Sequence, residues 1–127
     1  MKDNRPRNID LASITAYAFP LPAITSILHR ISGIAVFLMI PLLLCLADLS
    51  LSSEQGFAQA QQYMSSWSVK LFFWLTLSGI AYHLFAGIKH LIMDFGYAET
   101  LQASRLASQL VLIISVVAAI LLGVWVW

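Results

Sequence analysis

Three long stretches without a charged residue constrain this chain more than any other feature. With histidine counted as neutral, they cover 17 residues from Ile31 to Ala47, 18 from Leu71 to Ile88 and 22 from Leu106 to Trp127. A helix needs about 20 consecutive apolar residues to cross the hydrocarbon core of a bilayer. The sequence therefore predicts an all-α membrane protein with three transmembrane helices.

We expect a single domain over residues 1–127, with an arm at residues 1–21 and spans at about residues 22–47, 66–94 and 103–127. Only 10% of the residues are charged, against roughly a quarter in soluble domains. Three spans with short flanks leave no room for a nucleotide-binding or iron–sulfur domain, and the six glycines form no phosphate-binding cluster. A net charge of +1 gives no reason to expect nucleic acid as a partner.

The basic residues predict an orientation, because lysine and arginine accumulate on the cytoplasmic side of membrane proteins. Lys70 stands alone on one side of the predicted spans. The other side receives Lys2, Arg5, Arg7, Arg30, Lys89 and Arg105. We therefore expect a cytoplasmic amino terminus and an outer carboxyl terminus. Trp67, Trp125 and Trp127 then share the outer interface, where tryptophan is enriched.

The connection before the second span has helical features of its own. Ser52 and Gln55 resemble a capping box, in which two side chains satisfy the first backbone N–H groups of a helix. Apolar side chains then recur at helical spacing, at Phe57, Ala60, Met64 and Trp67. These patterns predict that the second span begins as an amphipathic extension outside the membrane. Gly96 is expected to end that span.

Polar side chains within the spans are the candidates for function, because hydrocarbon penalises them. They are Ser26, His29 and Arg30 in the first span, and His83, Lys89 and His90 in the second. A helix rises about 1.5 Å per residue, which puts Ser26 and Arg30 about 6 and 12 Å inside the start of the first span. His90 and His83 lie about 6 and 16 Å inside the end of the second. Both sets therefore occupy the cytoplasmic half of the membrane and line one pocket if the two spans are neighbours.

His83 is the candidate ligand of a b-type haem, which is usually held by neutral imidazole. His83 and His90 share one helix face, so they cannot bind opposite faces of the same porphyrin. His83 is the deeper of the two, and Gly79, Ala86 and Gly87 leave its side nearly bare. The second ligand must then come from another helix, either from His29 or from a partner chain.

The remaining polar residues have both functional and structural interpretations. Arg30, His29, His90 or Lys89 could face the haem propionates, but Lys89 and His90 could equally be interface anchors. His83 itself could be a neutral histidine that forms a hydrogen bond across a helix interface. Arg30 lies deep and needs an anionic or carbonyl partner. Cys45, the single cysteine, is expected to be a small core residue.

Three sequence pieces resemble one family. They are Arg5-Pro6-Arg7-Asn8-Ile9-Asp10-Leu11, Ser26-Ile27-Leu28-His29-Arg30-Ile31-Ser32-Gly33, and the segment from His83 to Gly96 that reads HLFAGIKHLIMDFG. The chain resembles the cytochrome b556 subunits of succinate dehydrogenase, the larger of the two membrane anchors of that enzyme. The resemblance extends to length and to the three-span layout. Lys89 stands where this family usually has arginine, which would replace a bidentate contact by a point-charge contact.

The resemblance implies an assembly of four subunits in a bacterial inner membrane. Its partners are a flavoprotein that oxidises succinate, an iron–sulfur protein that carries electrons, and a second membrane anchor. His83 resembles the axial ligand of haem b, with the opposite ligand supplied by the smaller anchor. Ser26 and Arg30 resemble the pair that binds ubiquinone, and His29 and Arg30 approach the haem propionates in similar proteins.

Other function classes remain open from the sequence. The same anchor role in a fumarate reductase differs only in the direction of electron flow, which this chain does not determine. A haem-free structural anchor is a second alternative. A small transporter is a third, although the scarcity of acidic residues within the spans disfavours proton coupling.

Overall fold

The structure is a computed structural model, and it describes residues 19–127 of the chain. It has four helices over that range: α2 (Leu21–Ser52), α3 (Glu54–Ser65), α4 (Trp67–Asp94) and α5 (Leu101–Val126). Most of the predicted arm at residues 1–21 lies outside the described residues. So do the first of the three family-like sequence pieces and the basic residues Lys2, Arg5 and Arg7. The all-α class is confirmed for the described part, and α2, α4 and α5 are long and apolar enough to cross a membrane.

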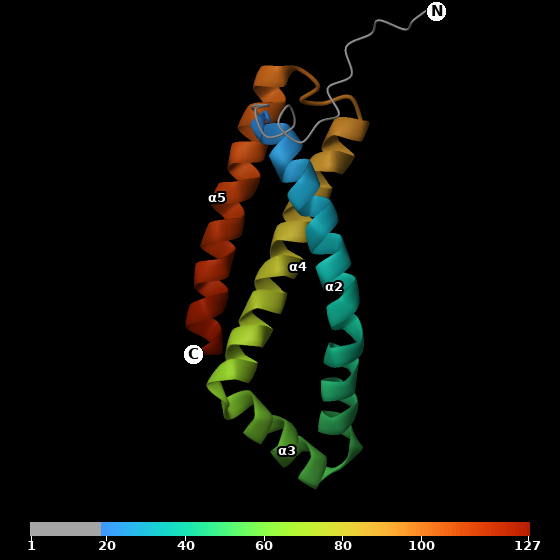
Figure 1. Cartoon of the computed structure of the whole chain (residues 1–127), viewed down its shortest axis with the longest axis vertical. Helices are drawn as coiled ribbons and strands as arrows, with labels where there is room; N and C mark the ends of the chain where they lie inside the picture. Colours follow the sequence, from blue (N-terminus) through green and yellow to red (C-terminus); the bar gives the residue numbers. More distant parts are fainter. Residues whose placement is uncertain (1–18) are drawn as a thin grey trace, which may run out of the picture.

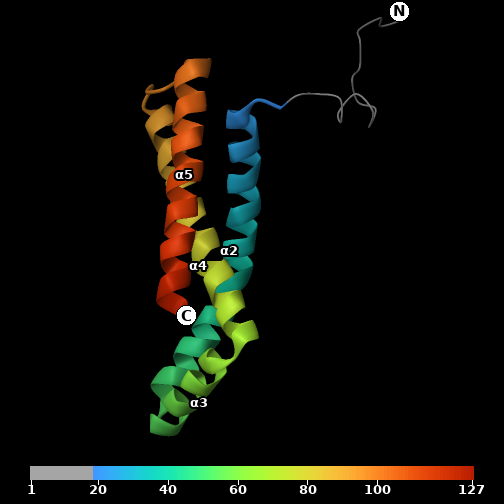
Figure 2. The same cartoon turned by 90° about the vertical axis from the view of Figure 1, so that its left-hand side faces the viewer.

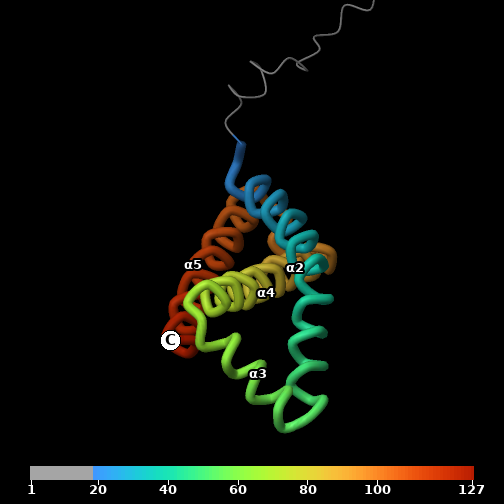
Figure 3. The backbone as a smooth tube through the Cα atoms, turned by 60° about the horizontal axis from the view of Figure 1, so that its bottom comes forward, coloured from blue at the N-terminus to red at the C-terminus, as the bar shows by residue number. Residues whose placement is uncertain are grey.

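The three long helices form a bundle in which α4 packs against both α2 and α5 (Figure 1). The beginning of α2, the end of α4 and the beginning of α5 meet at one end of the bundle, which carries Arg30, Lys89 and Arg105 and which we call the basic end. From there α2 and α5 diverge. At the opposite end, α3 crosses from the end of α2 to the beginning of α4 (Figure 3). Figure 2 shows that α3 lies beyond the last residue of α5.

The helices agree with the predicted spans at most of their ends. α4 begins at Trp67 and α5 at Leu101, within two residues of the predicted starts at 66 and 103. α2 continues to Ser52, five residues beyond the predicted end at 47. Its 32 residues correspond to about 48 Å at 1.5 Å per residue. Because the hydrocarbon core is about 30 Å thick, part of α2 extends beyond it.

The start of α3 corrects the predicted capping box. Ser53, not Ser52, caps this helix, because its side chain accepts a hydrogen bond of 3.0 Å from the backbone N–H of Gly56. The Ser52 hydroxyl donates instead to the carbonyl of Leu49 within α2. Gly56 is required here, since an added Cβ atom would collide with the Leu49 carbonyl and the Ser52 side chain. The corner between α2 and α3 is therefore built by close backbone approach.

The predicted amphipathic segment is a separate helix. α3 ends at Ser65, and Ser66 adopts an extended backbone with φ −71° and ψ 133° before α4 begins. The apolar face of α3 packs beside the end of α2 and the start of α4, where Phe57, Ala60 and Met64 line a shared hollow. The prediction of one continuous helix is therefore wrong, but the apolar spacing that it used is real.

Gly96 ends α4 as predicted. Its φ of 85° is left-handed, and the backbone N–H groups of Gly96 and Tyr97 donate to the carbonyls of Met93 and Ile92 at 2.9 and 3.2 Å. This pair of bonds is the Schellman arrangement, which satisfies the last carbonyls of a helix. The turn to α5 is consequently short, and it keeps the two helices antiparallel and in contact.

One face of α5 is buried and small. Ser104, Ser108, Val111 and Ser115 recur at intervals of four and three residues, so they share one side of the helix. Small residues allow membrane helices to approach closely. The hydroxyls of Ser108 and Ser115 donate to the carbonyls four residues earlier at 2.8 and 2.7 Å. The outer faces of the bundle expose large apolar side chains, as a lipid environment requires.

The turn between α4 and α5 supplies a paired test, because Gly96 and Ala98 both have left-handed backbones, with φ of 85° and 58°. Gly96→Ala should lower the free energy of unfolding by about 1 kcal/mol, because a Cβ atom is unfavourable in this region. Ala98→Gly should be neutral or slightly stabilising, since it removes such an atom. Thermal unfolding of the full-length protein in detergent measures both. Equal losses from the two substitutions would contradict the assignment of the turn.

Candidate functional site

Three imidazoles gather between α2 and α4 near the basic end. The rings of His29 and His83 are stacked, with centroids 4.2 Å apart and planes inclined by 16°. His90 lies on the other side of His29, with centroids 5.0 Å apart and planes tilted by 39°. The structure thus brings the three histidines of the first two spans together, and their role in binding a cofactor stays a prediction.

Hydrogen bonds fix the orientation of the His83 ring. Its Nδ1 lies 3.1 Å from the backbone carbonyl oxygen of His29 and 3.0 Å from the Ser32 hydroxyl. The Ser32 hydroxyl in turn donates to the same carbonyl at 2.8 Å. A carbonyl can only accept, so this geometry favours a proton on Nδ1. The lone pair is then on Nε2, which has no hydrogen-bond partner among residues 19–127.

Glycine makes room for the rings, although not in the way that the sequence suggested. Gly33 of α2 faces His83, and a Cβ atom there would lie 2.9 Å from Cε1 of the ring. The space beside Gly87 contains His29, whose Nε2 would be 3.4 Å from an added Cβ atom. Ala86 is buried, whereas Gly79 has open space around it. The space beside Gly87 is thus occupied by another imidazole, whereas the space beside Gly79 is open.

Ser26 and Arg30 lie four residues apart in α2 and therefore on one side of that helix. Arg30 is exposed and Ser26 is half-buried. Within the described range, neither side chain has a hydrogen bond or an ion pair. The Arg30 guanidinium and the Ser26 hydroxyl thus lie one turn apart on the same side of α2, where a ligand could contact both.

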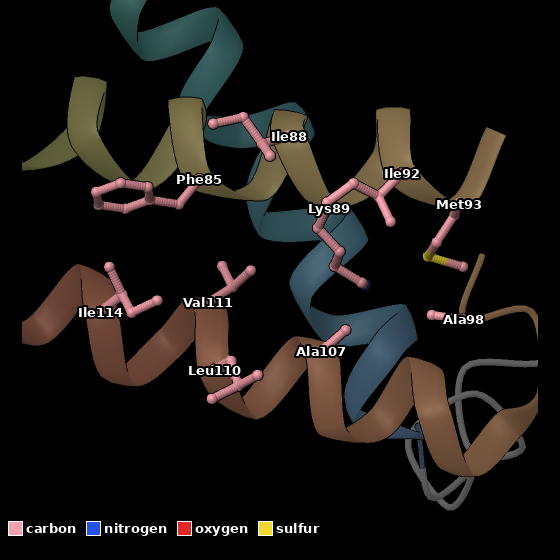
Figure 4. A pocket seen from close by; sticks show the side chains of 10 residues that line it. All are labelled: Phe85, Ile88, Lys89, Ile92, Met93, Ala98, Ala107, Leu110, Val111 and Ile114. Atoms are coloured by element: carbon pink, nitrogen blue, oxygen red, sulfur yellow. The ribbon is translucent and has the colours of Figure 1, made fainter. Parts of the chain in front are cut away.

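Lys89 does not join the three imidazoles. Its side chain is 5% exposed and its ammonium donates to the Thr25 hydroxyl at 3.3 Å. Figure 4 shows the lysine extending between α4 and α5 toward α2, on the wall of a cavity of about 220 Å³ that apolar side chains otherwise line. A contact of Lys89 with a propionate stays a prediction; here the ammonium is engaged by α2.

The donor set fits a haem better than a bare metal ion. Within residues 19–127, no three His, Cys, Asp or Glu side chains converge to hold a metal. A b-type haem needs only one ligand from each side, and His83 offers an oriented imidazole with its Nε2 lone pair available. His29 and His83 stack face to face, which leaves no room for a porphyrin between them. Of the two sources considered for the second ligand, this arrangement favours a partner chain.

Comparison with known proteins identifies the family. Residues 1–122 match the model of the succinate dehydrogenase/fumarate reductase transmembrane subunit. The chain belongs to this family. The suspected resemblance is therefore confirmed.

Individual relatives within the family share most or all of the chain. A protein of Coxiella burnetii named succinate dehydrogenase cytochrome b556 subunit is 41% identical and covers 100% of both chains. A protein of the same name from Paracoccus denitrificans is 34% identical over 94% of this chain and 90% of its own. The cytochrome b560 subunit of Reclinomonas americana is 34% identical over 88% and 79%. Family membership and three apolar helices support the predicted location as a multi-pass protein of a bacterial inner membrane.

Several residues around the candidate site were not predicted from the sequence. Ser32 lies within hydrogen-bond distance of the His83 ring, and Gly33 leaves room for that ring. The serine–glycine pair one turn after His29 could have indicated that a bulky side chain packs there. Thr25, Tyr82 and Ser108 join the three long helices at the basic end. The four- and three-residue spacing of the serines in α5 indicated a packing face, but not which helix would meet it.

Proposed function

We propose that this chain is a membrane anchor of a succinate:ubiquinone oxidoreductase, that it supplies one ligand of a b-type haem, and that it forms part of the ubiquinone-reduction site. Family membership supports the anchor role, and relatives named cytochrome b support the haem. The observation that carries the proposal is the orientation of His83, whose Nδ1 is held by a carbonyl while Nε2 is free. The partners are then a flavoprotein, an iron–sulfur subunit and a second membrane anchor.

His83 would hold the haem iron through Nε2. The bond from Nδ1 to the His29 carbonyl fixes the tautomer and the ring orientation, as outer hydrogen bonds do for metal-binding histidines. When bound, a b-type haem supplies a one-electron store beside the quinone. His29 stacks on this ring and His90 lies beyond His29. These two histidines and Arg30 would meet the propionates. The second anchor would provide another ligand.

Ser26 and Arg30 would bind the quinone at the surface of α2. The Ser26 hydroxyl would donate to a quinone carbonyl. Each quinone takes up two electrons from the iron–sulfur partner and two protons from water, so its oxygens gain negative charge before they are protonated. Arg30 always carries its charge and would stabilise that developing negative charge. The absence of any ion-pair partner for Arg30 in the range 19–127 supports this role.

His83→Ala tests the haem ligand. The purified assembly should lose its b-type absorption spectrum, because His83 is the proposed iron ligand of this chain and alanine has no group that could replace it. Thr76→Ala is the matched control, seven residues earlier on the same helix, where the hydroxyl bonds only the Phe72 carbonyl within α4, and it should retain the spectrum. An unchanged spectrum in His83→Ala would refute the ligand assignment. The lack of a Soret band in the unaltered assembly would favour the haem-free anchor.

Arg30→Ala tests the quinone site. Succinate-driven ubiquinone reduction should fall about 100-fold, as when one charge-stabilising group is removed, while succinate oxidation by an artificial dye is retained. Arg105→Ala, which removes an exposed arginine of α5, is the control and should change neither rate. Equal loss of both activities in Arg30→Ala would indicate misassembly. Quinol-driven fumarate reduction much faster than the succinate reaction would favour the fumarate reductase alternative.

A further inference from the structure

Hydrogen bonds from both α4 and α5 meet at Thr25, for which no role was expected. Its side chain is 1% exposed, and that of Ser108 is 0% exposed. These two are the largest fully buried side chains of the described residues. The tightest point of the bundle is therefore polar, and it lies at the basic end beside the candidate quinone site.

Both neighbouring helices hold Thr25. Its hydroxyl lies 3.2 Å from the Ser108 hydroxyl of α5 and accepts from the Lys89 ammonium of α4 at 3.3 Å. Its backbone carbonyl accepts from the Tyr82 hydroxyl, also of α4, at 2.9 Å. We call these four residues, Thr25, Tyr82, Lys89 and Ser108, the helix junction. Side chain and backbone are held separately, so the junction fixes the rotation of α2 as well as its position.

Helix geometry connects this rotation to Ser26 and Arg30. Successive residues turn by about 100° around a helix axis. With Thr25 directed into the bundle, Ser26 turns about 100° away, and Arg30 follows on the Ser26 side. Their exposure agrees with this, since Ser26 is half-buried and Arg30 is exposed while Thr25 is buried. A rotation of α2 would move both groups around the surface together.

Lys89 makes this arrangement costly to disturb. A buried ammonium needs acceptors, and Thr25 is its single hydrogen-bond partner in residues 19–127. Loss of the Thr25 hydroxyl would leave the Lys89 ammonium buried among the three helices without this acceptor. α2 would then have to turn or separate from α4 to let water or another acceptor reach the ammonium.

We propose that Thr25 and Lys89 are positioning residues for the quinone site: through the helix junction they fix the direction in which Ser26 and Arg30 face. This inference rests on the proposed function. It assigns no contact with quinone to either residue. Their effect reaches the substrate only through the rotation of α2.

Thr25→Val in the complete membrane assembly tests the proposal, because valine keeps the shape of threonine and removes the hydroxyl. The KM for a short-chain ubiquinone should rise about tenfold, since a small misplacement of binding groups weakens a reaction strongly. The kcat and the dye-linked oxidation of succinate should change much less. Thr25→Ser, which retains the hydroxyl, should restore the low KM.

A double variant tests the part played by Lys89. Removing both partners of a buried polar contact is less harmful than removing one. Thr25→Val combined with Lys89→Met should therefore have a lower quinone KM than Thr25→Val alone. If the KM of the double variant is as high, or higher, the role of Lys89 is overturned.

Ser115→Ala is the matched control. Ser115 is buried on the same face of α5 as Ser108 and bonds the carbonyl four residues earlier in the same way, but it does not take part in the helix junction. Its replacement should leave the quinone KM unchanged. If Ser115→Ala raises the KM as much as Thr25→Val, the effect belongs to α5 packing in general and the proposal is overturned.

The outcomes separate this inference from the proposed function. If Arg30→Ala impairs ubiquinone reduction but Thr25→Val leaves the KM unaltered, the positioning role fails and the quinone site stands. The positioning role also fails if Thr25→Val reduces haem content and both activities in proportion with an unchanged KM. If Arg30→Ala leaves ubiquinone reduction intact, the quinone site itself is wrong, and the positioning role falls with it.

Discussion

Hydrogen bonds between helices are the interactions on which this bundle depends. In a bilayer the lipid tails are as apolar as leucine, so burying apolar side chains between helices brings little net gain. Close packing of small residues and polar contacts must hold the helices together instead. The described residues follow this rule, since their largest fully buried side chains are Thr25 and Ser108 rather than large apolar groups. The contact between them joins α2 to α5, the two helices that otherwise diverge.

The same constraint explains why the candidate site lies at the basic end. α2 and α4 are held together there by the Tyr82 and Lys89 bonds to Thr25, and the imidazoles fill the space immediately beyond. At the other end, Trp74 of α4 donates to the Ala119 carbonyl of α5 at 2.8 Å, and α3 separates α2 from α4. Polar groups that could bind a flat cofactor thus accompany the tightest helix contacts, where their positions are best fixed.

The sequence predicted the three spans and the stop at Gly96 because both follow from local properties, apolar length and backbone conformation. It also selected the three histidines, since polar groups in hydrocarbon are conspicuous. It did not predict that Lys89 turns toward Thr25 or that His29 stacks on His83. Helical spacing tells which residues share a face but not which neighbouring helix that face meets. The cap at Ser53 was missed for a similar reason, because it depends on the close approach of the α2 backbone to Gly56.

α5 contains none of the candidate haem or quinone ligands, yet the site depends on it. Without α5, the helices α2 and α4 would form a pair, joined at the basic end by the contacts of Tyr82 and Lys89 with Thr25. The Lys89 ammonium would then lie on a face that is open to lipid. The Lys89 ammonium could then turn from Thr25 toward the membrane surface, as lysine side chains near helix ends do. α5 covers that face with small residues, of which Ser108 is completely buried. Covering the lysine keeps the Lys89 hydrogen bond to Thr25 in place, so the third span stabilises the orientation of α2 although it carries none of the candidate ligand residues.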